Sequence, residues 1–207
     1  NVINVSRFIV NGPSTKTSGL DFKAQYDFDD FFGTDMVDAR VSMGLDGTYL
    51  LSYDRSDFTL FGADDVVIQA AQDRVGRHEL TGEFYSYPRL RATGFINVNG
   101  GPWNVRYQVQ YREGTKIIGG DCPASGASAA CRYDRATATF VNVGKSDDFW
   151  QHDLTGQFEL PWNTTISAGV QNIFDTDPPF VQSMYNYDYT NGNPLGRTFK
   201  IGVKQRF

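Results

Sequence analysis

The last residues of the chain alternate apolar and polar side chains, and this alternation limits the fold more than any other feature. Between residues 197 and 207, one parity holds Phe199, Ile201, Val203, Gln205 and Phe207, and the other holds Thr198, Lys200, Gly202, Lys204 and Arg206. Successive side chains of a β-strand point to opposite faces. The stretch therefore predicts a strand with one apolar face, and residues 38–55 and 104–114 repeat the pattern.

Weaker copies of the alternation raise the number of predicted strands to seven. Their limits are 6–28, 38–55, 78–98, 104–114, 146–160, 164–174 and 197–207. The connections alternate in length: 29–37, 99–103 and 161–163 are short, whereas 56–77, 115–145 and 175–196 are long. An up-and-down barrel in the outer membrane has short periplasmic turns and long extracellular loops. The rhythm is typical of that architecture.

A soluble β-sandwich also alternates apolar and polar residues, so periodicity alone leaves it open. Three features favour the membrane barrel: rows of Arg and Lys on the polar face, strands longer than the usual five or six residues, and aromatic residues near strand ends. These aromatic residues are Tyr26, Phe28, Tyr49, Tyr53, Tyr111, Phe158 and Trp162.

Composition excludes some classes of protein. No apolar run approaches the ~18 residues that a membrane-spanning helix needs, and the mean hydropathy is −0.40. A barrel strand needs only ~9–11 alternating residues and is compatible with that value. The net charge of −5 argues against a nucleic-acid partner, because such proteins carry a basic face. The chain starts without Met or a signal segment, and we interpret it as part of something longer.

The region near the C-terminus resembles a known family. Residues 167–175 read SAGVQNIFD, and they are followed by Asp177-Pro178-Pro179, by Gly196-Arg197 and by the final Phe207. This order resembles the terminal signature of TonB-dependent outer-membrane receptors. Two upstream segments, 150–154 and 11–21, resemble earlier strands of the same barrels.

The resemblance implies an all-β fold, a transmembrane antiparallel up-and-down barrel of approximately 22 strands. Residues 1–207 would form about its last seven strands, without the plug domain and the earlier strands. It also implies a bacterial outer-membrane location and contact with outer-membrane lipid. The TonB energy-coupling complex would act through the missing plug, and the barrel-assembly machinery would recognise the last strand with Phe207 as its signal.

Active import of a scarce nutrient is the leading functional hypothesis, and the solute would be a siderophore, vitamin, oligosaccharide or peptide. A passive or structural outer-membrane barrel and a soluble β-sandwich binding module are the alternatives. We expect that the protein is not an enzyme and that it contains no cofactor and no metal site. His78 and His152 have no metal-spaced partner, and no nucleophile motif such as G-x-S-x-G is present.

Two groups of residues are candidates for sites. Cys122 and Cys131 lie in the longest loop without neighbouring metal ligands, and an oxidising exterior favours a disulfide over a reactive thiol pair. Aromatic residues in two other loops either face a ligand or pack against loops; they are Phe84, Tyr85, Tyr87, Tyr185, Tyr187 and Tyr189. Basic residues on the polar face either attract an anionic solute or pair with acidic plug residues; they are Arg106, Arg112, Lys200, Lys204 and Arg206.

Overall fold

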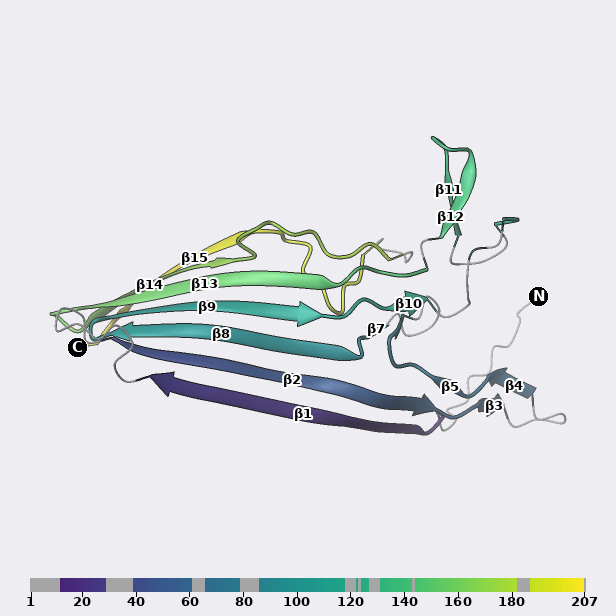
Figure 1. The fold of residues 1–207 in the computed structure, drawn as a ribbon, viewed down its shortest axis with the longest axis horizontal. Helices are drawn as coiled ribbons and strands as arrows, with labels where there is room; N and C mark the ends of the chain where they lie inside the picture. Colours follow the sequence, from purple (N-terminus) through teal and green to yellow (C-terminus); the bar gives the residue numbers. More distant parts are fainter. Residues whose placement is uncertain are drawn as a thin grey trace, which may run out of the picture.

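Seven long strands form one antiparallel meander (Figure 1). The computed structural model describes residues 12–28, 39–60, 66–78, 86–117, 122, 124–126, 131–142, 144–181 and 187–206. The long strands are β1 (Thr15–Phe28), β2 (Arg40–Arg55), β8 (Leu90–Gly100), β9 (Trp103–Arg112), β13 (Phe149–Leu160), β14 (Thr164–Gln171) and β15 (Thr198–Gln205). Each pairs with the next one along the chain. The predicted all-β, up-and-down architecture is confirmed.

Short strands lie at one end of this sheet (Figure 1). β5 (Gln72–Asp73) extends the main sheet beside β2. The others form three small sheets: β6 (Arg77–His78), β7 (Ser86–Tyr87) and β10 (Lys116–Ile117); β3 (Phe58–Leu60) and β4 (Val66–Gln69); β11 (Cys131–Asp134) and β12 (Thr139–Asn142). All of them belong to the long connections, so we call this the loop end.

The opposite end of the sheet holds tight turns. Residues 101–102 join β8 to β9, and residues 161–163 join β13 to β14. Gly101 and Asn163 adopt positive φ angles of 72° and 58° there, a conformation that glycine and asparagine accept at low cost. The predicted connection 29–37 lies outside the described residues. Short and long connections therefore alternate as expected from the sequence.

Most predicted strand limits lie within a few residues of the observed ones, but the third strand is wrong at its start. Residues 78–98 were expected to be continuous, whereas β8 begins at Leu90. His78 instead pairs with Ser86 in the small sheet of β6 and β7. Pro88 lies between β7 and β8, where a missing N–H prevents one continuous ladder. The first strand, predicted over 6–28, begins only at Thr15: residues 12–14 are described and lie outside β1, and residues 6–11 are outside the described residues.

One face of the meander is apolar and uncovered among the described residues. Its largest exposed fractions are 83% for Ile201, 71% for Phe199 and 70% for Val203. Buried apolar residues in the described part are few: Ala39, Val41, Val75, Cys131, Phe149 and Val181. A sandwich would cover such a face with a second sheet, so the soluble β-sandwich does not fit. No helix in the described ranges is long and apolar enough to cross a membrane.

A β-bulge changes the phase of β2 near the loop end. Ser18 pairs with Ser52 while Gly19 pairs with Leu50, which leaves Leu51 as the extra residue. An extra residue moves every later side chain to the other face. Unbroken alternation with Val41, Met43 and Leu45 assigns Tyr53 to the apolar face. This prediction is wrong, because Tyr53 lines the same hollow as Leu50 on the polar face.

Candidate functional site

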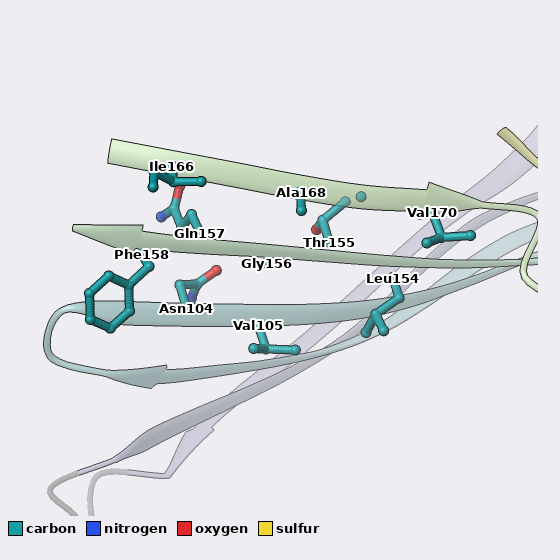
Figure 2. Close-up of a pocket in the computed structure, with 11 residues that line it drawn as sticks. Asn104, Val105, Leu154, Thr155, Gly156, Gln157, Phe158, Ile166, Ala168 and Val170 are labelled. Atoms are coloured by element: carbon teal, nitrogen blue, oxygen red, sulfur yellow. The ribbon is translucent and has the colours of Figure 1, made fainter. Parts of the chain in front are cut away.

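The apolar face contains a shallow groove that follows from small residues at its centre. Gly156 pairs with Val105 on one side and with Ala168 on the other. In Figure 2, Gly156 lies between Leu154 and Phe158 along β13, and Ala168 lies between Ile166 and Val170 along β14. The groove measures about 390 Å³. Leu154, Phe158 and Val170 are among the apolar side chains of its walls, of the kind that a barrel presents to lipid. Asn104, Thr155 and Gln157 also line it.

Aromatic side chains lie toward both ends of this apolar face. Tyr111 and Trp150 are directly opposite each other near the loop end, with ring centroids 4.5 Å apart. Trp162 lies in the tight turn after β13 and is 63% exposed. Aromatic girdles at the two interfaces of a membrane are typical of outer-membrane barrels. The apolar band between them has the pattern of a lipid-facing wall.

The opposite face is polar, and its side chains contact one another across strands. Thr48 donates a hydrogen bond to Asp21 at 2.6 Å, and Gln110 donates one to Asp153 at 3.0 Å. The Arg106 guanidinium lies 3.8 Å from the centre of the Phe95 ring. Such hydrogen-bonded polar side chains are expected where a barrel encloses water. This face therefore corresponds to the lumen.

A hollow of about 800 Å³ opens on the polar face at the loop end. It combines tyrosines from three different segments with hydroxyl groups and one arginine. The residues that characterise it are Tyr53, Tyr87, Tyr189, Thr48, Thr190 and Arg91. Its volume lies within the ~300–1,000 Å³ of small-molecule sites. An aromatic lining with a few polar groups is also the usual composition of such sites.

Two of these tyrosines, Tyr53 and Tyr87, pack against each other in the wall of the hollow. The rings of Tyr53 and Tyr87 stack with centroids 4.3 Å apart and planes inclined by 30°. Tyr53 reaches this position because of the bulge at Leu51, and Tyr87 comes from β7. An aromatic pair of this kind contributes about 0.5–1.5 kcal/mol beyond its buried area. The pair presents a rigid apolar surface to the hollow.

The last long loop is fastened to β7 by the carboxylate of Asp188, which is only 4% exposed. Ser86 donates a short hydrogen bond to this carboxylate. The backbone N–H groups of Thr190 and Asn191 donate at 3.0 Å and 3.2 Å. Burial alone would raise the pKa of Asp188, but the hydrogen bonds from Ser86, Thr190 and Asn191 hold it below its ordinary value. The charged carboxylate therefore positions the loop that carries Tyr189.

His78 lies behind this network and is 1% exposed. Neither ring nitrogen has a hydrogen-bond partner in the part of the chain that the structure describes. Burial lowers the pKa of His78, and the nearby charge of Asp188 opposes this shift only in part. A neutral imidazole sealed from solvent cannot reach a substrate. His152, on the apolar face, bonds to the hydroxyl of Tyr107 through Nδ1 at 2.6 Å.

The residues of the C-terminal motif form one structural unit. Asn172 and Asp175 follow the end of β14 and have positive φ angles of 54° and 56°. The Asp175 carboxylate then accepts a hydrogen bond from the backbone N–H of Arg197 at 2.7 Å. A side chain on Gly196 would place its Cβ 2.7 Å from the same carboxylate. The motif thus joins the exit of β14 to the start of β15 across the last long loop.

Cys122 and Cys131 form a disulfide with their Cα atoms 4.9 Å apart, as the sequence predicted. Cys131 is the first residue of the β11–β12 hairpin, so the bond ties this hairpin to the preceding loop. In the described ranges, no three His, Cys, Asp or Glu residues come together as a metal site would require.

The structure brings some of the predicted loop aromatics together. Tyr87 and Tyr189 line the hollow, although their sequence positions are about a hundred residues apart. Tyr187 is described but is not among the lining residues. Phe84, Tyr85, Tyr185 and Phe207 lie outside the described residues.

Sequence reasoning missed Tyr53 and Arg91. The alternation of β8 places the side chain of Arg91 on the polar face. The sequence alone was therefore enough to predict the orientation of Arg91. The bulge that redirects Tyr53 coincides with two consecutive apolar residues, Leu50 and Leu51, and this break in the alternation was the available signal.

Comparison with known proteins supports the architecture. A family model described as TonB dependent receptor-like, beta-barrel matches residues 2–173. No curated protein and no solved structure matched the chain. The matched range covers β1 through β14 and ends before Asp175. It therefore rests mainly on the strands and not on the closing residues 175–207.

Proposed function

Because the chain belongs to the TonB-dependent receptor-like β-barrel family, we propose that it forms part of the wall and of the solute-binding surface of a receptor that imports a scarce nutrient. The family consists of non-enzymatic transporters of the outer membrane, and its name implies coupling to TonB. The observation that carries the proposal is the division of one sheet into two faces. One face is an uncovered apolar wall, and the other is a polar surface with a hollow at the loop end.

Each part of the sheet has a distinct role in this proposal. The apolar band faces lipid and holds the receptor in the outer membrane. The hollow lies at the end that carries the long loops, which in these barrels is the extracellular side. Tyr87 and Tyr189 would contact the arriving solute there. The candidate solutes are siderophores, vitamins, oligosaccharides and peptides.

The remaining parts of the receptor are also proposals. β1 and β15 are the edges of the sheet in the described residues, and unpaired backbone groups are costly in lipid. Further strands would close the barrel, and a plug domain would fill its lumen and receive force from the TonB complex. The barrel-assembly machinery would recognise the last strand with Phe207.

Separate measurements of binding and accumulation test this function. Labelled candidates from each solute class are supplied to cells with and without the energy-coupling complex. We expect surface binding in both strains, and accumulation only in coupled cells that maintain a proton-motive force. Accumulation at the same rate in uncoupled cells would show a passive pore and support the alternative of a passive outer-membrane barrel.

A further inference from the structure

The chemistry of the hollow narrows the class of solute, provided that the proposed import function holds. Three kinds of groups meet there: the stacked rings of Tyr53 and Tyr87, the hydroxyls of Thr48 and Thr190, and the guanidinium of Arg91. The rings offer a flat apolar surface. The two hydroxyls donate their protons to Asp21 and Asp188, so their oxygens are left as hydrogen-bond acceptors for a solute. Arg91 adds a fixed positive charge, because guanidinium stays protonated.

The side chain of Arg91 has no hydrogen bond or ion pair with the described residues. This differs from Arg106 on the same face, which bonds to Gln108 and covers the Phe95 ring. The guanidinium of Arg91 thus keeps all five donors available in a hollow built from aromatic and hydroxyl groups. A planar fork of donors matches a carboxylate in a bidentate arrangement.

The neighbours of Arg91 in its cross-strand row strengthen this argument. On one side Arg91 lies directly opposite Arg112, and like charges in that position repel each other. On the other side it lies opposite Thr48, whose hydroxyl already donates to Asp21. The carboxylate of Asp188 is occupied by Ser86 and by the loop that it fastens. Asp153 and Asp188 offset part of the charge of Arg112. In contrast, no carboxylate of the described residues pairs with the Arg91 guanidinium, so an incoming anion would reduce the remaining repulsion there.

We infer that the hollow binds a ring-bearing solute that carries a carboxylate, with the ring on the Tyr53–Tyr87 stack and the carboxylate on Arg91. The required chemistry is shared by acidic saccharides and by aromatic acids. A neutral analogue of either kind would keep the stacking contact but would lose the charge-assisted hydrogen bonds.

The test measures equilibrium binding to the receptor purified in detergent from outer membranes. The probes are digalacturonate and its neutral counterpart digalactose, and 2,3-dihydroxybenzoate and its neutral counterpart catechol. We expect at least one acid to bind about tenfold more tightly than its neutral partner, which corresponds to about 1.4 kcal/mol. The preferred pair then distinguishes a saccharide from an aromatic acid.

Two substitutions locate the preference. Arg91→Gln should abolish the preference for the acid and leave binding of the neutral probe within about twofold. Arg106→Gln is the matched control, because it removes the same charge from the same face outside the hollow, and the preference should persist. Each variant must keep the heat-dependent gel mobility of a folded barrel.

Other results would overturn the inference. Acid and neutral probes that bind equally, or fail to bind at all, would do so, as would equal losses in the two variants. Binding to purified receptor needs no energy source. These results are therefore independent of the accumulation experiment, which alone decides the import function.

Discussion

Replacing Ile201 by arginine should destabilise the barrel strongly, and the structure supplies the magnitude. Ile201 pairs with Ala168, which pairs with Gly156. Gly156 lies midway along the chain between Trp150 and Trp162, near the two ends of the apolar band, so this row lies near the middle of the membrane. Ile201 is 83% exposed, so its loss creates no cavity. The cost is then that of a charge at the bilayer midplane, about 2–4 kcal/mol.

The measurement is urea unfolding of the receptor in phospholipid vesicles, followed by intrinsic fluorescence. The matched control is Lys200→Leu, one residue earlier and on the lumen face beside Gly169. We expect that change to shift the free energy of unfolding by less than about 0.5 kcal/mol, as surface substitutions usually do. Equal costs for the two variants, or the reverse order, would refute the assignment of faces in β15.

Two further predictions concern the loop end. Alkylation of unreduced receptor followed by intact-mass measurement should label neither Cys122 nor Cys131, and two labelled thiols would contradict the disulfide. The pKa of Asp188 is lowered in the folded state, so the stabilisation from its charge is complete above the ordinary aspartate value and is lost as pH falls through the lowered one. The protection of the Thr190 and Asn191 amides against hydrogen exchange, measured relative to the intrinsic exchange rate at each pH, should therefore fall below about pH 4. Asp188→Asn should weaken the loop by about 1–3 kcal/mol and remove this acid dependence, and an unchanged profile would refute the anchoring role.

The wall of the barrel was predictable because it depends on a local rule. A face that meets lipid selects apolar residues at every second position, so Phe199, Ile201 and Val203 reveal both strand and orientation. The tight turns likewise carry their own signals, such as Gly101. The seven strands and their order followed from these patterns.

The hollow was less predictable because it depends on contacts between distant segments. Ser86 and Asp188 are 102 positions apart, and neither residue type by itself indicates a partner. Pro88 separated β7 from β8 although the residues on both sides continue to favour strands. Tyr87 and Tyr189 were chosen as loop aromatics, but only the folded chain shows that they share one cavity with Tyr53.

The extra residue in β2 allows one strand to satisfy two different selective pressures. Before Leu51, the side chains of β2 are constrained by lipid on one side and by the lumen on the other. Beyond Leu51, the bulge shifts the alternation by one residue, so the side chains there point to the opposite faces from those that the earlier part of β2 would set. Deleting one residue at this point would move side chains between the lumen face and the lipid face only in the segment that contains Tyr53. Solute preference can therefore diversify by insertions and deletions at the rim while the wall below keeps its register.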